Sequence, residues 1–183
     1  MQYAKRDFPL ERIREHLETG PVVLVTSRHK RRSNIMTMGW HAMMQFSPAL
    51  FGCYIWDGNQ SYQAIRDSGE CVINIPTIEL LDKVVAIGNS HADEGDKFAM
   101  TGLIAKKASR VKAPLIKECY ANFECRLHDG KMVKKYGFFV WEVVKAHVAK
   151  VDKPRTLHYR GQGMFMVAGK EIDRKGQFKL ENL

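Results

Sequence analysis

Long apolar segments are absent from this sequence of 183 residues. No run reaches the roughly 18 apolar residues that a membrane-spanning helix requires. The first residues, MQYAKRDFPLERIREHLETG, also lack the apolar core of a secretory signal peptide. These absences predict a cytoplasmic protein with no membrane partner. No repeat, low-complexity segment or linker rich in proline or serine divides the chain, so we expect a single domain over residues 1–183.

Cysteine is scarce and shows no pairing pattern. The four cysteines form no CxxC motif, which argues against a zinc ribbon, a thioredoxin-like motif or a cysteine-ligated iron–sulfur cluster. Each cysteine lies in an apolar run, where a free thiol behaves as a small hydrophobic side chain. We therefore expect four buried thiols, at Cys53, Cys71, Cys119 and Cys125.

Motifs for catalysis by protein side chains are missing as well. No serine lies in a GxSxG turn, no cysteine has a histidine at a suggestive spacing, and no GxGxxG follows a strand. Carboxylates cluster only in HADEGD, where His91 and Asp93 could ligate a metal, but the spacing matches no metal motif and a solvated loop is the alternative. If the protein is an enzyme, a cofactor supplies the chemistry.

Positive charge is abundant, with a formal net charge of +9. Such a charge points to nucleic acid or an anionic ligand as a partner. The basic residues gather in three short runs between apolar segments, RHKRR, KKASRVK and KMVKK, which indicates solvated loops. No RNA-binding motif, Cys/His finger or basic zipper accompanies them, which argues against nucleic acid. A non-enzymatic binding module with a basic surface for nucleic acid or another anionic partner is kept as the alternative function.

The periodicity of apolar residues predicts a mainly β protein with helices. Most neighbouring strands are joined by short or single-helix connections, which favours an antiparallel sheet closed into a barrel with short helices packed outside. The expected helices cover residues 7–20, 59–69 and 77–89, and the expected strands cover residues 21–27, 31–45, 48–56, 70–76, 119–128, 136–151 and 163–169.

The second expected strand has an unusual composition. One of its faces carries Thr37, Gly39 and His41 in succession, and a glycine there lets a flat ligand approach the backbone closely. Downstream, Ser61 brings a hydroxyl to a helix start that suits a phosphate, and Lys97 could reach an anion. Together these features describe a site for an aromatic ligand with a phosphate. An irregular core filled by methionine is the alternative, and haem is a weaker one.

Three segments in this order resemble the flavin reductase-like family of FMN-binding split barrels, near its flavoredoxin members: SNIMTMGWHAMMQFSPALFGCYI, NQSYQAIRDSGECVINIP and DKFAMTGL. The resemblance places the core of the domain at about residues 21–167. It implies a homodimer whose barrel binds FMN non-covalently near the subunit interface. It also implies that no protein residue is catalytic.

The resemblance carries over to individual positions. The segment from Asn34 to Trp40 would line the flavin, Ser61 would approach its phosphate, Lys97 would also contact the cofactor, and Phe165 would close over it. Tyr136 stands where relatives often have histidine and could donate a hydrogen bond to the cofactor. Trp141 replaces a common glycine and would narrow the pocket. The expected cofactor-binding residues are Asn34, Met36, Thr37, Met38, Trp40, Ser61, Lys97, Tyr136 and Phe165.

The implied activity is electron transfer. Electrons would come from NADH, NADPH or a redox protein and pass to free flavin or to an electron-acceptor protein. The basic loops would attract a nicotinamide dinucleotide or an acidic redox partner by electrostatic steering. A reductase that oxidises a nicotinamide and a carrier that only shuttles electrons remain open alternatives at this point.

Overall fold

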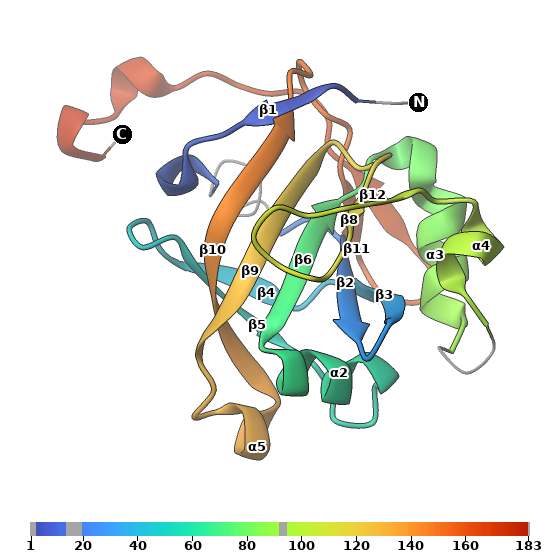
Figure 1. Cartoon of the computed structure of the whole chain (residues 1–183). Helices are drawn as coiled ribbons and strands as arrows, with labels where there is room; N and C mark the ends of the chain where they lie inside the picture. The colour runs from blue at the N-terminus through green and yellow to red at the C-terminus, as the bar shows by residue number, and fades with distance from the viewer. Residues whose placement is uncertain (1–2, 14–19, 92–94, 183) are drawn as a thin grey trace.

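An eight-stranded antiparallel sheet forms the body of the computed structural model, which describes residues 3–13, 20–91 and 95–182 (Figure 1). Its strands follow the order β3-β2-β6-β9-β10-β5-β4, and β1 pairs with β10. The strands of this sheet are β1 (Lys5–Asp7), β2 (Val23–His29), β3 (Arg32–Met38), β4 (His41–Gln45), β5 (Leu50–Tyr54), β6 (Glu70–Ile75), β9 (Ala121–Asp129) and β10 (Phe138–Ala149).

Short helices and two small hairpins surround the sheet (Figure 1). The α-helices are α2 (Gln60–Ser68), α3 (Leu81–Asn89), α4 (Lys97–Thr101) and α5 (Val133–Tyr136), and the 3-10 helices are η1 (Leu10–Arg12), η2 (Ile78–Leu80), η3 (Lys175–Gln177) and η4 (Leu180–Asn182). The hairpins pair β7 (Ala105–Lys106) with β8 (Leu115–Ile116) and β11 (Leu157–Tyr159) with β12 (Phe165–Val167). The predicted mainly β, antiparallel architecture with short outer helices is therefore confirmed. No helix among the described residues is long and apolar enough to cross a membrane.

The sheet is split between the strands at its two ends. β3 and β4 occupy opposite ends of the strand order although only Gly39 and Trp40 separate them in sequence. The sheet must therefore curl until its ends approach each other, and in the described residues no ladder joins β3 to β4. The prediction of one continuous strand over residues 31–45 is wrong for this reason. The link also breaks the alternation of faces, so Met36 and Met38 are buried while Trp40 and Met44 are exposed.

Apolar clusters lie on both faces of the sheet, and two of them are extensive. The larger fills the barrel and includes Phe51, Phe123 and the stacked pair Phe139 and Trp141, whose rings are 5.5 Å apart. The smaller lies beneath α3 and α4 and is built around Leu24, Ile35, Val84 and Phe98. Both faces of β2 are therefore buried, which explains its continuous β-branched run. All four cysteines are free and buried, as predicted.

Residues 105–116 cover the second face of β6 and β9. The sequence predicted a strand over residues 119–128, and the structure buries the side chains on both faces of β9 from Ala121 to Cys125. Glu124 is fully buried there and accepts hydrogen bonds from the Ser109 backbone N–H at 3.0 Å and from the Ser109 hydroxyl at 2.9 Å, and its carboxylate lies 2.8 Å from Nε2 of His147. Burial raises the pKa of Glu124, but these hydrogen bonds outweigh it and lower the pKa overall.

Several helix boundaries follow from capping. The Asn59 side chain accepts the Ser61 backbone N–H at the start of α2, and Gly69 ends that helix with a positive φ of 61°. The helix expected over residues 77–89 begins as the 3-10 turn η2 and continues as α3, which ends at Asn89. The helix expected over residues 7–20 is only partly described. Asp7 lies in the strand β1, the 3-10 turn η1 follows, and residues 14–19 are outside the described residues.

Candidate functional site

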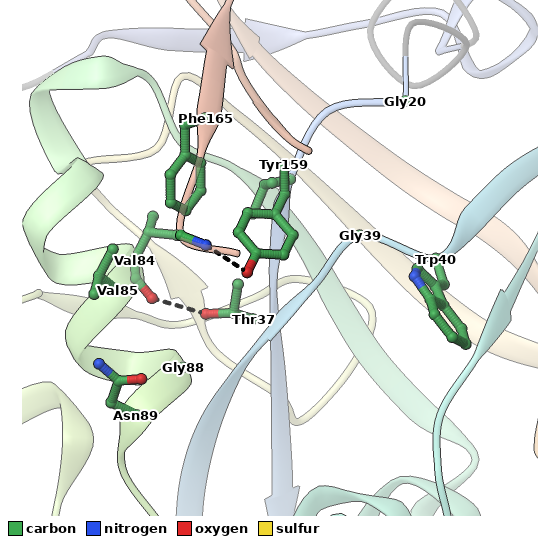
Figure 2. Close-up of a pocket in the computed structure, with 12 residues that line it drawn as sticks. Gly20, Thr37, Gly39, Trp40, Val84, Val85, Gly88, Asn89, Tyr159 and Phe165 are labelled. Atoms are coloured by element: carbon green, nitrogen blue, oxygen red, sulfur yellow. Dashed lines mark hydrogen bonds between the residues drawn. The ribbon is translucent and has the colours of Figure 1, made fainter. Parts of the chain in front are cut away.

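A pocket of about 610 Å³ opens where the sheet is split (Figure 2). Its floor is formed by Thr37 of β3 and by Gly39 and Trp40 of the link between β3 and β4. Val84 and Val85 of α3 line the opposite side. A pocket of this size lies within the range of roughly 300–1,000 Å³ that is usual for small ligands and cofactors. We call it the ring pocket.

Aromatic side chains flank the ring pocket. Tyr159 of β11 and Phe165 of β12 lie together above Thr37, with ring centroids 5.1 Å apart (Figure 2). The Tyr159 hydroxyl accepts a hydrogen bond from the Gly163 backbone N–H at 3.1 Å, which holds the ring in place. Trp40, which is 72% exposed, stands on the far side and packs against Tyr54 at 5.4 Å. Flat apolar surfaces are thus available on two sides of the opening.

Thr37 fixes α3 to the floor of the ring pocket. Its hydroxyl donates to the backbone carbonyl of Val84 at 3.0 Å (Figure 2). Gly88 lies one turn further along α3, and a methyl group there would meet Oγ1 of Thr37 at 3.7 Å. The absence of a side chain at Gly88 keeps the space between α3 and β3 open.

A second pocket of about 140 Å³ adjoins the ring pocket and shares Thr37 and Gly88 with it. Asn34 and Met36 of β3 line one side, and Lys97 lines another. Because the two pockets have walls in common, they form one continuous trough along β3. We call the smaller part the anion pocket.

Hydrogen-bond donors gather at the anion pocket. Nδ2 of Asn34 donates to the hydroxyl oxygen of Ser61 at 2.9 Å, which leaves the hydroxyl proton of Ser61 able to donate elsewhere. Ser61 is 1% exposed and lies in the first turn of α2, where the backbone N–H groups and the helix dipole favour an anion. Asn59 and Gln60, at the start of that helix, line the pocket.

Lys97 brings a positive charge to the same place. Its side chain is buried, and its ammonium donates to the backbone carbonyls of Ser90 at 2.8 Å and Ile87 at 3.3 Å, at the end of α3. Asp96 caps α4 by accepting the Phe98 backbone N–H at 2.9 Å, and so fixes the first residue of that helix, Lys97. A cation held in a small pocket beside amide and hydroxyl donors is suited to a phosphate.

His41 supports the link between β3 and β4 from behind. Its Nε2 lies 2.7 Å from the carbonyl oxygen of Pro21, and its buried Nδ1 has no hydrogen-bond partner among the described residues. Burial lowers the pKa of His41, and the hydrogen bond to Pro21 opposes this only in part. The imidazole is therefore neutral at physiological pH.

The structure brings most of the predicted site residues together. Ser61 is buried beside Asn34, and the trough itself is lined by Asn34, Met36, Thr37, Trp40, Lys97 and Phe165. Two predicted residues lie elsewhere. Met38 packs in the barrel core, where Met36 on the same face also packs, but of the two only Met36 reaches the anion pocket. Tyr136 ends α5, is 56% exposed, and lies outside both pockets, because β10 carries that end of the barrel away from α3 (Figure 1).

Trp141 does not narrow the pocket in the way the sequence suggested. It is fully buried in the barrel, stacks on Phe139, and its Nε1 donates to the sulfur of Cys53 at 3.3 Å. The metal pair that the sequence suggested, His91 and Asp93, lies only partly within the described residues. His91 lines the anion pocket, Asp93 is outside the described residues, and the part of the chain that the structure describes holds no cluster of three metal-binding side chains.

Several lining residues were not identified from the sequence. Val84 and Gly88 belong to a segment that reads simply as an amphipathic helix, and nothing in it reveals which residues face β3. Tyr159 lies in a three-residue strand that is too short for a periodic pattern. Its one sequence signal is the apolar–polar–aromatic order of Leu157, His158 and Tyr159, just before the predicted last strand.

Comparisons with known proteins identify the family of this chain. The family model for flavin reductase-like domains matches residues 16–167. An uncharacterized protein of Archaeoglobus fulgidus is 35% identical over 121 residues, which are 66% of this chain and 67% of that protein. The uncharacterized protein YddH of Escherichia coli K12 is 30% identical over 171 residues, which are 85% of this chain and 90% of that protein.

Solved structures show the same fold. An FMN-binding domain of a flavin reductases-like enzyme from Shewanella baltica superposes with a TM-score of 0.89 at 23% identity, covering 96% of this chain and 100% of that one. Flavoredoxin of Desulfovibrio vulgaris superposes with a TM-score of 0.77 at 20% identity, covering 85% and 90%. The split-barrel fold expected from the sequence is thus shared with these proteins.

Proposed function

Because the chain belongs to the family of flavin reductase-like domains, as its motifs predicted, we propose that it is an oxidoreductase that binds FMN non-covalently in the trough along β3. One observation carries the proposal. An open pocket with aromatic flanks continues, past Thr37 and Gly88, into a small pocket that holds a buried lysine. An apolar pocket that leads into a cationic pocket can hold a ligand whose flat ring system is joined to a phosphate.

The ring pocket would orient the flavin ring and exclude water from its faces. The backbone at Gly39 and the side chain of Thr37 offer a flat floor, and Tyr159 and Phe165 cover it from the opposite side. Val84 and Val85 supply apolar contact along one edge. An electron donor or acceptor would reach the ring through the open side of the pocket.

The anion pocket provides most of the binding energy for the phosphate end. Lys97 supplies a full positive charge, and the Ser61 hydroxyl, the Asn34 amide and the start of α2 supply hydrogen bonds. Hydrogen bonds to a charged group are each worth roughly 1.5–3 kcal/mol. FMN is therefore expected to bind more tightly than riboflavin, which lacks the phosphate.

The bound flavin would supply the redox chemistry, taking two electrons from a donor and releasing them to an acceptor. The side chains of the trough bind and orient it, and none of them takes part in a bond-making step. We propose a reduced nicotinamide, NADH or NADPH, as the donor, and free flavin or an acceptor protein as the recipient. A redox protein as donor is the alternative within the same function.

Anaerobic mixing with each nicotinamide tests the donor. Loss of the visible flavin absorbance with NADH or NADPH supports the reductase. If neither nicotinamide reduces the flavin but a ferredoxin-like protein does, the protein is an electron carrier and the nicotinamide proposal is wrong.

Substitutions at the anion pocket test the binding site. Lys97→Ala and Asn34→Ala should each raise the dissociation constant of FMN about tenfold, because each removes one contact to the phosphate. The far-UV circular dichroism should not change. Lys150→Ala, an exposed lysine directly after β10, is the matched control. Unchanged FMN affinity in both pocket variants would place the phosphate elsewhere.

We also propose that the protein is a homodimer. Trp40, Met44 and Phe46 are 72%, 51% and 60% exposed on and beside β4, at one end of the sheet. Exposed apolar side chains in such a group indicate a protein–protein contact, and a second copy of the chain would cover them. Light scattering should give the mass of two chains, and Phe46→Lys should shift it to one chain. A monomeric wild type would refute this proposal.

A further inference from the structure

The turn that joins β9 to β10 carries a compact group of exposed cations. It comprises residues 130–137 and contains α5, which lies at the end of β10 away from β1 (Figure 1). Lys131, Lys134 and Lys135 are exposed on this turn, and the Asp129 carboxylate, 4.0 Å from Nζ of Lys131, balances part of their charge. The turn therefore keeps a surplus of positive charge. We call residues 130–137 the hairpin tip.

Contacts with the barrel hold the backbone of the hairpin tip in place. Val133 is buried, and its carbonyl accepts a hydrogen bond from the Tyr62 hydroxyl at 3.3 Å. Gly137 ends α5 with a φ of 63°, and its carbonyl accepts the Ile55 backbone N–H at 2.9 Å. A partner that binds the tip therefore meets a backbone that is already ordered, which lowers the entropic cost of association.

Exposed apolar side chains accompany the cations of the hairpin tip. Met132 is 41% and Tyr136 is 56% exposed, and Nζ of Lys135 lies 5.1 Å from the centre of the Tyr136 ring. Aromatic and methionine side chains are enriched in protein interfaces, and charged groups form the rim. Small interfaces are usual in transient electron-transfer complexes. The tip thus has the composition of a small protein-docking surface.

Aromatic side chains connect the hairpin tip to the ring pocket. Trp40 lines that pocket and packs on Tyr54, with ring centroids 5.4 Å apart. Tyr54 pairs with Phe138 at the start of β10, and a methyl group added at Gly137 would lie 3.0 Å from the Tyr54 ring. These contacts offer an electron a path from the pocket to the tip through rings that touch, without a gap of solvent.

We propose that the hairpin tip docks an acidic one-electron carrier protein, which takes electrons from the flavin in the ring pocket by way of Trp40 and Tyr54. The inference rests on the proposed function, because it specifies the acceptor protein and the place where it binds. Two carrier molecules would each take one electron in turn, and the two protons of the reduced flavin would pass to solvent. Carboxylates of the carrier would face Lys134 and Lys135 and speed its association.

Reduction of cytochrome b5, an acidic haem protein that accepts one electron, tests the docking surface. The FMN-loaded full-length protein is photoreduced without oxygen, so that no nicotinamide is needed, and is then mixed with the oxidised cytochrome. The second-order rate constant should fall about tenfold from low to high ionic strength, because salt screens the attraction. Cytochrome c, which is basic, should show the opposite dependence on salt.

Charge reversal at the hairpin tip should abolish this behaviour. Lys134→Glu together with Lys135→Glu should lower the rate constant with cytochrome b5 about tenfold at low ionic strength and remove most of its salt dependence. The affinity for FMN should not change, because neither lysine is among the residues that line the trough. Lys150→Glu together with Lys153→Glu, the same charge change at the opposite end of β10, should react like the wild type.

Cross-linking with a carbodiimide, which joins a lysine amine to a carboxylate, gives a measurement that needs no flavin. Flavin-free protein mixed with cytochrome b5 should form a covalent complex, and peptide mapping should locate the link at Lys134 or Lys135. High salt should suppress the complex. A link that maps to other lysines would overturn the proposed surface.

Two substitutions at Tyr54 test the path. Tyr54→Leu removes the ring and should slow electron transfer at saturating cytochrome b5, while the yield of cross-linked complex stays the same. Tyr54→Phe keeps the ring and should transfer electrons at close to the wild-type rate. Wild-type transfer in Tyr54→Leu would overturn the path through this residue.

Other results overturn the docking surface. A rate constant with cytochrome b5 that changes neither with salt nor with the charge of the hairpin tip would show that the carrier binds elsewhere. If light scattering shows that the doubly substituted tip variant loses a dimer that the wild type forms, the tip is a contact between copies of the chain. Failure of the protein to bind FMN refutes the proposed function, whereas failure of the cross-linking in a protein that binds FMN refutes only this inference.

Discussion

The hydroxyl of Thr37 in β3 donates a hydrogen bond to the carbonyl of Val84 in α3, at 3.0 Å. This contact joins a strand at the split of the sheet to the helix that forms the opposite side of the ring pocket (Figure 2). It fixes the width of the trough, because both residues line it. The position of α3 relative to β3 is thus set by a side chain within the site.

Thr37→Val removes this hydrogen bond and keeps the shape of the side chain. The free energy of unfolding should fall by about 1 kcal/mol, the usual net value of such a bond. The dissociation constant of FMN should rise severalfold, because α3 is then less firmly placed. Urea unfolding and flavin fluorescence measure the two effects. Thr37→Ser, which keeps the hydroxyl, should retain wild-type values, and equal loss in both variants would contradict this role.

Gly88→Ala should raise the stability of the protein while lowering its affinity for FMN. Glycine is unfavourable in a helix, so alanine should raise the free energy of unfolding by about 0.5 kcal/mol. The added methyl group lies 3.7 Å from Oγ1 of Thr37, where the ring and anion pockets meet, so FMN affinity should fall. Gly169→Ala, which meets no atom within 4 Å, is the control for affinity. Tighter FMN binding by Gly88→Ala would show that the trough does not pass this point.

His41 should make the protein less stable in mild acid. Burial lowers its pKa in the folded state below the unfolded value of about 6.5, so protonation favours unfolding. Stability that is present above about pH 6.5 should be lost as the pH falls toward the lowered pKa. Urea unfolding of the wild type and His41→Gln across this range measures the effect. The variant should show a flatter dependence, and parallel curves would rule out His41 as the cause.

The four cysteines should not react with a thiol reagent in the native protein. All are buried, and burial raises the pKa of Cys53 to about 12 and the pKa values of Cys71 and Cys119 as well. The reactive thiolate form of these three residues is therefore nearly absent near neutral pH, and burial keeps the reagent from Cys125. Absorbance assays should detect four thiols only after denaturation. Rapid labelling of any thiol in the folded protein would contradict the assignment of these residues to the core.

Local sequence patterns identified the half of the site that lies on β3. Asn34, Thr37 and Trp40 stand out because polar or exposed aromatic residues interrupt an apolar strand, and the structure places all three on the trough. Lys97 could be found from the motif around it. Met38 could not be separated from Met36 in this way, because two methionines on one face of a strand have the same pattern whether they meet a ligand or the core.

The rest of the site depends on long-range packing. The break at Gly39 and Trp40 arises because the sheet curls on itself, and no local propensity reveals where the two ends of a sheet meet. Tyr159 reaches the ring pocket only because the hairpin of β11 and β12 folds over it. The buried contacts of Glu124 likewise join β9 to residues 15 positions away.

The most direct test of the central claim is the visible absorbance spectrum of the purified protein, with identification of any cofactor released on denaturation. The account predicts flavin absorbance bands and FMN in the released fraction. Protein that is purified without flavin should acquire the same bands when FMN is added. A colourless protein that does not take up added FMN would contradict the account and leave the trough along β3 without its proposed ligand.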